Sequence, residues 1–259
     1  MSQSYFNDKQ QREVFHYLFL ERLLRVSEPK FYVLKGGVNL RFFLNSPRYS
    51  EDMDIDVFGG SVQTLKKNGY KILSDPSFLR QLRSYGVREL LVNDPFKTKQ
   101  TQTTQRFRLR LKNQAGEEFP TKVEFSRRNS KPEEVFAREM IHPEIARTYK
   151  RISYPCQHYT GESAAIQKIR ALAYRKQLQV RDVFDLFILY NSGYLTTRTR
   201  EFLTPQELSL AAKNLMSFSY LDYEGQVLEY LPLSERRLYE GPEPWEQMQA
   251  MIMEILSSG

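Results

Sequence analysis

Residues 31–60 read FYVLKGGVNLRFFLNSPRYSEDMDIDVFGG, and the rest of the chain is best interpreted outward from them. An apolar run ends at Lys35, and Asp52, Asp54 and Asp56 follow later. Their i, i+2, i+4 spacing, with apolar residues between them, predicts a strand with three acids on one face. Aspartate is depleted in strands, so this pattern needs a reason. A divalent metal beside a phosphate group would supply one, and a solvated polar edge strand is the alternative.

The glycine pair upstream, Gly36 and Gly37, favours the metal interpretation. Glycine lets a backbone turn sharply and approach a ligand closely. We expect a helix over residues 38–44, starting directly after the pair. The free N–H groups and positive dipole end of a helix start suit a phosphate. The alternative is a plain strand-to-helix turn.

Composition indicates a globular protein of one large domain or two smaller ones. The chain has 259 residues, 41% of them hydrophobic, and one cysteine, Cys156. A single cysteine excludes an intrachain disulfide and fits a reducing cytoplasmic location. The three histidines lack zinc-finger spacing. The N-terminus lacks a signal-peptide pattern, and no apolar run approaches the ~18 residues of a membrane span, so we expect no membrane association.

The charge is unevenly distributed along the chain. The net charge is +7, but residues 218–259 contribute −6, which leaves +13 on the rest. Residues 97–128 hold nine basic side chains against three acidic ones. Such a surface suits a polyanion, and nucleic acid is the leading candidate. Ordinary solvated charge is the alternative.

Hydrophobic periodicity predicts alternating elements in the first half of the chain. The 7–26 segment has helical spacing. Residues 106–111 alternate strictly between arginine and apolar side chains, and 119–126 return as the second strand of a hairpin. The other expected elements are a strand at 31–34, two helices in 61–86 broken near Asp75, a strand at 88–92 and a loop at 97–105.

Glu124 lies in the second strand of this hairpin. If that strand neighbours the aspartate strand, Glu124 faces Asp52 and Asp54 and completes a three-carboxylate metal site. The alternative is a cross-strand ion pair with an arginine of the 106–111 strand. The sequence does not choose between them.

From about residue 132 the pattern becomes helical. We therefore expect an α+β protein with a mixed-sheet domain over 1–131 and a helical domain over 132–259. Thr160 has the character of an N-cap. Lys168 borders the apolar stripe of the helix that follows, where it would reach either phosphate oxygens or water.

Residues 181–190 form another expected helix. Asp182 suits its first turn. Asp185 lies among apolar residues, and a buried carboxylate needs a partner, for which Arg181 and Lys168 are the candidates. Further helices are expected to the end of the chain, the last beginning after Pro244.

These residues together carry a resemblance to a known family. Gly36-Gly37 followed by Arg48-Tyr49-Ser50-Glu51-Asp52-Met53-Asp54 resembles the GG…R-[FY]-S-x-D-[hydrophobic]-D signature of AbiEii-type nucleotidyltransferase toxins, members of the DNA polymerase β-like superfamily. Lys122-Val123-Glu124-Phe125, Lys168-Ile169-Arg170-Ala171-Leu172 and Arg181-Asp182-Val183-Phe184-Asp185-Leu186 resemble its third-carboxylate strand, lysine helix and R-D-x-x-D-L helix. The resemblance spans about residues 31–190. Val38-Asn39 departs from the usual Thr-Ala.

The resemblance implies a polymerase β-like mixed sheet, a C-terminal helical bundle and a metal-dependent nucleotidyltransferase. Asp52, Asp54 and Glu124 would bind Mg²⁺, with Mn²⁺ as an alternative. Catalysis would consist mostly of positioning and charge stabilisation. The nucleoside triphosphate would be bound by the phosphate-contacting residues, which are Gly36, Gly37, Arg48, Ser50 and Lys168. Asp182 and Asp185 would orient Lys168 or the nucleotide.

The resemblance also implies partners. The acceptor would be RNA, in particular the 3′ end of tRNA, and a cognate antitoxin would be encoded beside a toxin of this kind used in phage defence. In AbiE systems the antitoxin is a DNA-binding repressor. Two other classes remain alternatives, a metal-dependent RNA phosphohydrolase or nuclease with the same acids, and a non-catalytic nucleotide- or RNA-binding protein of the same fold.

Overall fold

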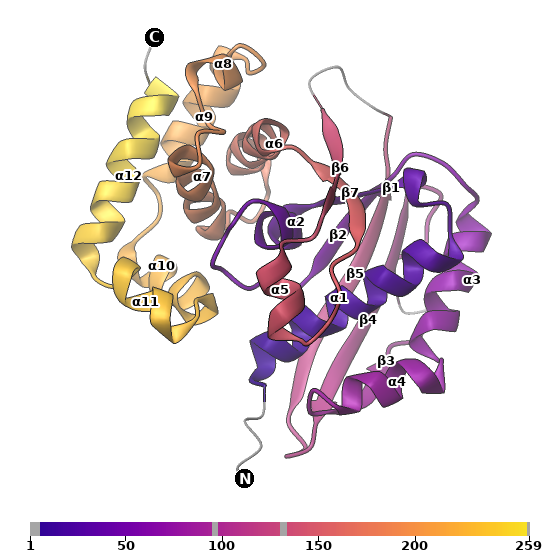
Figure 1. Cartoon of the computed structure of the whole chain (residues 1–259). Coiled ribbons are helices and arrows are strands. Elements are labelled where there is room, and N and C mark those ends of the chain that lie inside the picture. The colour runs from indigo at the N-terminus through magenta and orange to yellow at the C-terminus, as the bar shows by residue number, and fades with distance from the viewer. Residues whose placement is uncertain (1–5, 95–97, 130–133, 258–259) are drawn as a thin grey trace. The chain divides into compact units, whose positions relative to one another are not determined.

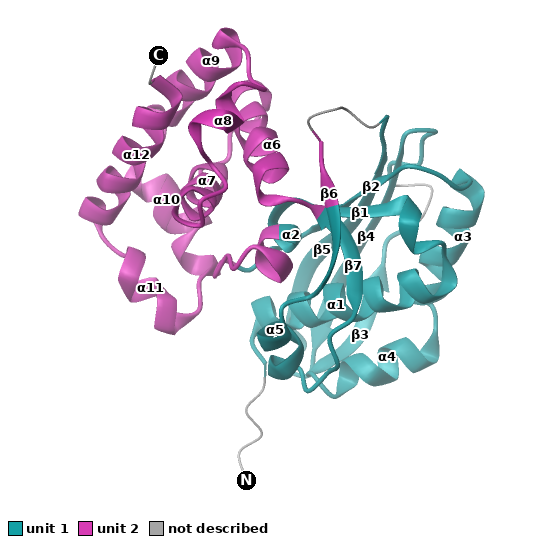
Figure 2. Ribbon diagram, turned by 45° about the horizontal axis from the view of Figure 1, so that its top comes forward, with its two compact units in different colours: residues 1–39, 49–131, 137–158 teal, residues 40–48, 132–136, 159–259 magenta. Residues whose placement is uncertain are grey.

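The computed structural model describes residues 6–94, 98–129 and 134–257, which fall into two compact units (Figure 2). The sheet unit comprises residues 1–39, 49–131 and 137–158, and the helical unit comprises residues 40–48, 132–136 and 159–259. The boundary expected between residues 131 and 132 lies outside the described residues, as does the start of the basic segment at Lys97.

A seven-stranded mixed sheet forms the centre of the sheet unit (Figure 1). The strand order is β3-β4-β5-β2-β1-β7-β6. Strand β2 pairs antiparallel with β1 and parallel with β5, and β5 pairs antiparallel with β4 as the predicted hairpin. The bounds are β1 Tyr32–Lys35, β2 Met53–Val57, β3 Val87–Val92, β4 Thr104–Asn113, β5 Glu118–Arg127, β6 Phe136–Met140 and β7 Pro155–Tyr159.

Three helices cover one face of this sheet. They are α1 (Asp8–Val26), α3 (Val62–Leu73) and α4 (Pro76–Arg83), and they pack on β5, β4 and β3 respectively. The predicted start of α1 is confirmed, because Asn7 and Gln10 form a capping box. The predicted break near Asp75 is also confirmed, since Asp75 caps α4 through the Ser77 amide.

The hairpin has two chemically different faces. Phe107 and Phe125 stack edge to face and are fully buried, and Phe107 also contacts Tyr70 of α3. Side chains alternate along a strand, so Arg108 points to the opposite face, where it is exposed. We call this opposite side of β4 and β5 the arginine face.

The expectation that the chain is helical from residue 132 is wrong for two segments. Strand β7 pairs parallel with β1, with Leu34 opposite His158, and β6 is its edge neighbour. Helix α5 (Pro143–Thr148) lies between them. Strand β6 is largely exposed and lacks an alternating apolar pattern, so hydrophobic periodicity carried no signal for it.

The helical unit is built on one apolar core. Helix α6 (Gly161–Tyr174) packs on α7 (Arg181–Asn191) and α9 (Pro205–Leu215), and α12 (Pro242–Ser257) packs on α7 and α9. Trp245 stacks on Tyr223 with ring centroids 4.9 Å apart. Three shorter helices complete the unit, namely α8 (Thr197–Arg200), α10 (Tyr220–Gln226) and α11 (Leu233–Tyr239).

The N-cap predicted at Thr160 is confirmed, since its hydroxyl accepts from the Ser163 amide. The last helix begins at Pro242, three residues before the predicted start at Trp245. Across the described ranges, no helix combines the length and apolar character that crossing a bilayer requires.

Adjacent residues on β4 give a test of the two faces. Phe107→Ala should lower the free energy of unfolding by about 3–5 kcal/mol, because it leaves a cavity under α3. Arg108→Ala should change it by less than about 0.5 kcal/mol, because the side chain is exposed. Denaturant unfolding of both variants measures the difference, and equal costs would contradict the alternation of the strand.

Candidate active site

The predicted aspartate strand lies in the middle of the sheet. Strand β1 ends at Lys35, which lies opposite Asp54 of β2, and Asp54 lies opposite Glu124 of β5. Helix α2 (Gly36–Phe43) follows β1 directly. The two glycines are therefore its first residues, and the helix starts two residues earlier than expected.

Asp54 lies against the start of this helix. Gly36 has a φ of 67°, and a Cβ built there would come within 3.3 Å of Asp54 Oδ2. Any side chain at Gly36 would therefore crowd the carboxylate and be strained. Within residues 6–94, 98–129 and 134–257, no group donates a hydrogen bond to the Asp54 carboxylate and no cation forms an ion pair with it.

The surroundings of Asp54 raise its pKa above the usual 3.8. Burial is the main cause, and the negative charges of Glu124 and Asp52 act in the same direction. Lys35 and Lys122 act against it, but they do not offset the burial. Asp54 is thus a carboxylate whose charge lacks compensation, which is the electrostatic condition that a bound cation would relieve.

Asp52 comes immediately before β2 and contacts β5. The backbone N–H of Lys122 donates to its Oδ1 at 3.1 Å, and the Lys122 Nζ lies 2.9 Å from its Oδ2. The Ser50 hydroxyl donates to the Asp52 backbone carbonyl at 2.9 Å. Ser50 therefore supports the turn into the strand, and its predicted contact with a nucleotide stays a prediction.

Glu124 fits both sequence-based alternatives. Its strand position faces Asp54, and its Oε2 accepts from Arg106 Nε across the hairpin at 2.5 Å. Across the described residues, no three Asp, Glu, His or Cys side chains converge into a group that would hold a metal by itself. The structure therefore brings Asp52, Asp54 and Glu124 onto neighbouring strands without forming a closed three-carboxylate site.

This arrangement still fits a magnesium–nucleotide complex. Mg²⁺ usually keeps several waters and binds through one or two carboxylates together with substrate phosphates. Asp54 lies against the helix start and carries the uncompensated charge, and Asp52 lies two residues before it in the chain. The residues present thus supply the protein share of such a site.

Asp56 has a different environment from the other two aspartates. It is buried, accepts from Lys35 Nζ and lies 3.6 Å from Arg128 Nε. Lys35 thereby links the end of β1 to β2 beside the site. In the sequence, Lys35 was noted only as the residue before the glycines. Its ion pair with Asp56 arises because β1 and β2 are antiparallel neighbours.

The departure from the family pattern at Val38-Asn39 has a structural counterpart. The Asn39 side chain is fully buried and its Oδ1 lies 3.0 Å from His158 Nδ1 of β7. His158 Nε2 in turn lies 3.5 Å from Glu139. Asn39 thus holds the first turn of α2 against the neighbouring strand, a role that a threonine-alanine pair would not supply.

The helical unit contains a buried charge network made of predicted site residues. Lys168 Nζ donates to Asp182 Oδ1 at 2.8 Å and to Asp185 Oδ2. Arg48 Nη2 donates to both oxygens of Asp185 at 2.9 Å, and Arg175 Nη1 lies 2.7 Å from Asp182 Oδ2. Four predicted site residues, Arg48, Lys168, Asp182 and Asp185, therefore form one connected network.

Asp185 is the centre of this network and is fully buried. Burial raises the pKa of its carboxyl, but Arg48 and Lys168 outweigh that effect and hold it below the usual range. Of the two partners expected from sequence, the structure shows Lys168. It adds Arg48, which lies 137 residues away in the chain.

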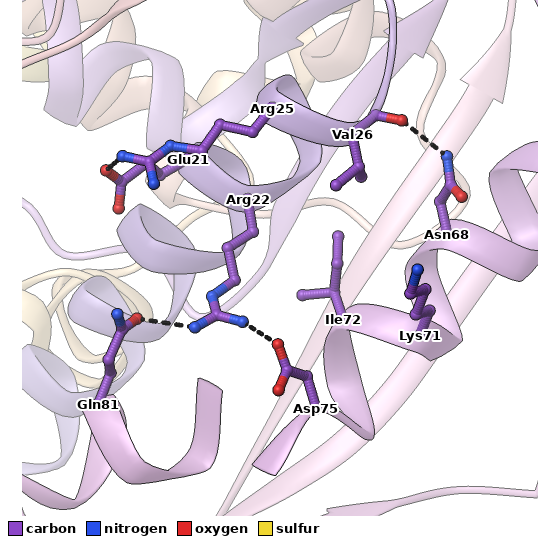
Figure 3. Close-up of a pocket in the computed structure, with 9 residues that line it drawn as sticks. All are labelled: Glu21, Arg22, Arg25, Val26, Asn68, Lys71, Ile72, Asp75 and Gln81. Atoms are coloured by element: carbon purple, nitrogen blue, oxygen red, sulfur yellow. Dashed lines mark hydrogen bonds and ion pairs between the residues drawn. The ribbon is translucent and has the colours of Figure 1, made fainter. Parts of the chain in front are cut away.

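A pocket lies on the helix-covered side of the sheet unit, between α1, α3 and α4. Its volume is about 230 Å³, and Val26, Asn68 and Ile72 are among its lining residues. Figure 3 shows Arg22 reaching across it toward Asp75 and Gln81. This pocket contains none of the predicted site residues.

Fold and site together define a class of protein. Carboxylates on a central strand beside a glycine-started helix are the arrangement expected of a nucleotidyltransferase, and solved structures of that class are similar. MenT4, a nucleotidyltransferase toxin from Mycobacterium tuberculosis H37Rv, is 17% identical with a TM-score of 0.63, over 98% of this chain and 86% of that one. JHP933 from Helicobacter pylori is 20% identical with a TM-score of 0.54, over 98% and 96%. At these identities the likeness shows the fold.

The family follows from the sequence itself. Residues 18–257 match the model described as "Nucleotidyl transferase AbiEii toxin, Type IV TA system". The chain therefore belongs to the AbiEii nucleotidyltransferase toxin family, as the motifs predicted. No curated protein sequence matches the chain.

Asp54→Asn should stabilise the protein at neutral pH. A raised folded-state pKa means that stability is lost as the pH rises through it, and asparagine removes the ionising group. The melting temperature of the variant should exceed that of the wild type at pH 7–8. The difference should shrink as the pH falls below the usual aspartate pKa of 3.8.

Asp56→Asn is the matched control, because it has the same chemistry on the same strand. It should destabilise by about 1–3 kcal/mol, since it leaves Lys35 without its carboxylate. Thermal unfolding of the two variants across pH checks the contrast. A loss of stability in both would contradict the uncompensated state of Asp54.

Asp185→Asn should destabilise the protein by about 3–5 kcal/mol, because it leaves the charges of Arg48 and Lys168 buried with too little compensation. Glu240 offers a control, since it is an ion-paired acid of the helical unit whose side chain keeps half of its surface exposed. Glu240→Gln should cost about 1 kcal/mol or less. Denaturant unfolding measures the free energy of unfolding of both variants, and a cost for Asp185→Asn as small as that of the control would show that the buried network is dispensable for stability.

Proposed function

We propose that this chain transfers a nucleotide from a nucleoside triphosphate, bound with Mg²⁺, to an RNA acceptor, with the 3′ end of tRNA as the expected target. The observation that carries the proposal is Asp54, a carboxylate with uncompensated charge held against the glycine start of α2. Family membership supports the transferase class, and the basic charge of the sheet unit supports a nucleic-acid acceptor.

Asp52 and Asp54 are the residues proposed to hold Mg²⁺, which would neutralise charge on the triphosphate and orient it. The N–H groups at Gly36 and Gly37 would contact phosphate oxygens at the positive end of α2. Lys122 of β5 forms an ion pair with Asp52 and so helps to position its carboxylate. The protein itself mainly binds and positions, as is usual for phosphoryl chemistry.

In the proposed reaction, the acceptor 3′ oxygen attacks the α-phosphorus and forms a new phosphodiester bond. The bond from the α-phosphorus to the bridging oxygen breaks, and pyrophosphate leaves with its electron pair. The hydroxyl proton goes to a general base, for which Glu124 is the proposed residue. Arg106 holds the Glu124 carboxylate in place through its Nε.

For the buried network of the helical unit we propose a positioning role. Asp182 and Asp185 hold the Lys168 ammonium in one place, and Arg48 fixes Asp185 from the other side. The Lys168 side chain keeps 11% of its surface exposed. Its contact with a triphosphate, like that of Arg48, stays a prediction. Membership of a toxin–antitoxin system implies an antitoxin partner, which we propose is encoded nearby.

The test is a transfer assay with Mg²⁺, each labelled nucleoside triphosphate in turn and total RNA. Label should pass to RNA with the wild type, and Asp52→Ala and Asp54→Ala should reduce the rate by roughly 100-fold or more. Asp54→Asn, which we expect to fold more stably than the wild type, separates lost activity from lost folding.

Three outcomes would contradict the proposal. One is no transfer from any nucleotide, and another is transfer that survives in both aspartate variants. The third is RNA cleavage that needs no nucleoside triphosphate, which would instead indicate a metal-dependent nuclease using the same acids.

A further inference from the structure

We propose that the arginine face binds the phosphodiester backbone of the acceptor strand, with Arg108 as the principal contact. This inference rests on the proposed function and deepens it. A groove of about 580 Å³ hollows the face beside Asp52. We call it the arginine groove, and its lining includes Glu51, Asp52, Asn93, Arg108, Arg110 and Lys122.

The groove is lined by cations that the hairpin places in an unfavourable arrangement. The register of β4 and β5 puts Arg108 directly opposite Lys122. Like charges directly opposite each other destabilise a strand pair. The neighbouring cross-strand pairs on the same face do not place like charges opposite each other, since Arg106 is opposite Glu124 and Arg110 is opposite Pro120.

The other cations of the face have acidic partners. Arg106 pairs with Glu124, Arg110 lies 3.1 Å from Glu118, and Lys122 lies 2.9 Å from Asp52. Within residues 6–94, 98–129 and 134–257, Arg108 forms no ion pair and no side-chain hydrogen bond. The Arg108 side chain is exposed in the groove, and its position on β4 is directly opposite that of Lys122 on β5.

An anion in the groove would relieve this unfavourable arrangement. A phosphate at Arg108 would compensate the one charge of the pair that has no acidic partner among the described residues, since Lys122 already pairs with Asp52. The planar guanidinium donates two parallel hydrogen bonds to a phosphate, which a surface lysine does not. The geometry therefore indicates a phosphate site more strongly than a general excess of positive charge would.

The sheet order distinguishes the acceptor from the nucleotide donor. The order β4-β5-β2-β1 places the glycine start of α2, which follows β1, on one flank of the aspartate strand. The arginine groove lies on the other flank, with β4 two strand spacings from β2, or roughly 10 Å. The helix start suits the triphosphate, so the groove on the opposite flank remains for the strand that receives the nucleotide.

The contacts in the groove also predict what kind of recognition occurs there. Phosphate contacts fix the position of a strand but carry no sequence information directly. The arginine groove should therefore bind single-stranded RNA with little regard to its sequence and with a strong dependence on salt. Selection of one particular RNA would have to come from other parts of the chain.

The experiment measures binding of a 12-nucleotide single-stranded RNA with a free 3′ hydroxyl by fluorescence anisotropy, without nucleotide, between 50 and 200 mM salt. Arg108→Ala should weaken binding about tenfold, near 1.4 kcal/mol. It should also lower the slope of log K against log salt by about 0.7, the value for one lost phosphate contact on a single strand. Arg108→Glu should weaken binding further.

Two controls accompany these variants. Arg83→Ala removes an exposed arginine of α4 on the helix-covered side, so RNA binding should equal that of the wild type. Binding of a Mg²⁺–nucleoside triphosphate to Arg108→Ala should also be unchanged, because the donor lies on the other flank.

Each other result has a defined meaning. RNA binding by Arg108→Ala that equals the wild type in affinity and salt slope would overturn the inference, as would a wild type that does not bind the RNA. Loss of nucleotide binding in Arg108→Ala would overturn it in favour of a donor site. RNA binding that depends on Arg108, in a wild type that transfers no nucleotide, would support the groove and contradict only the proposed transfer.

Discussion

The pairing of β2 on both sides is the constraint on which the site depends. Its antiparallel pairing with β1 brings Lys35 opposite Asp54, and its parallel pairing with β5 brings Glu124 opposite the same residue. Because strand side chains alternate with a period of two, a slip of one residue in either register would move the acids to the helix-covered face. The apolar residues Met53, Ile55 and Val57 prevent such a slip, since they are buried on that face.

The site concentrates arrangements that are unfavourable for folding alone. Asp54 carries a charge that burial disfavours, Arg108 faces Lys122, and Gly36 adopts a positive φ beside a carboxylate. Elsewhere in the described chain, buried charges such as Asp56 and Asp185 have cationic partners. Proteins tend to keep local conflicts of this kind where a ligand resolves them. The contrast between Asp54 and Asp56, two residues apart on one strand, separates the acid that we propose binds a ligand from one with a structural ion pair.

The sequence predicts whatever depends on local pattern. Strict alternation identified β4, and β5 followed as the returning strand of its hairpin. The polar start at Asn7 and the break at Asp75-Pro76 located helix ends, because period and capping are properties of neighbouring residues. Strand β6 was missed because it is an exposed edge strand without alternation. Other features depend on which distant segments meet. Examples are the ion pair of Arg48 with Asp185 and the position of Glu124, which lies opposite Asp54 and accepts a hydrogen bond from Arg106. Residue types alone do not determine that.

The interleaving of the two units has a consequence for how the protein is made. Neither unit is a continuous piece of chain, because residues 40–48 belong to the helical unit and residues 137–158 return to the sheet. During synthesis, β1 can pair with β7 only after β7 has been made, and Arg48 can pair with Asp185 only after α7 has been made. Such long-range contacts form late, because their loop-closure entropy must be overcome first. A nascent chain interrupted before β7 therefore lacks the completed sheet, and one interrupted between β7 and α7 has all seven strands but lacks the buried charge network.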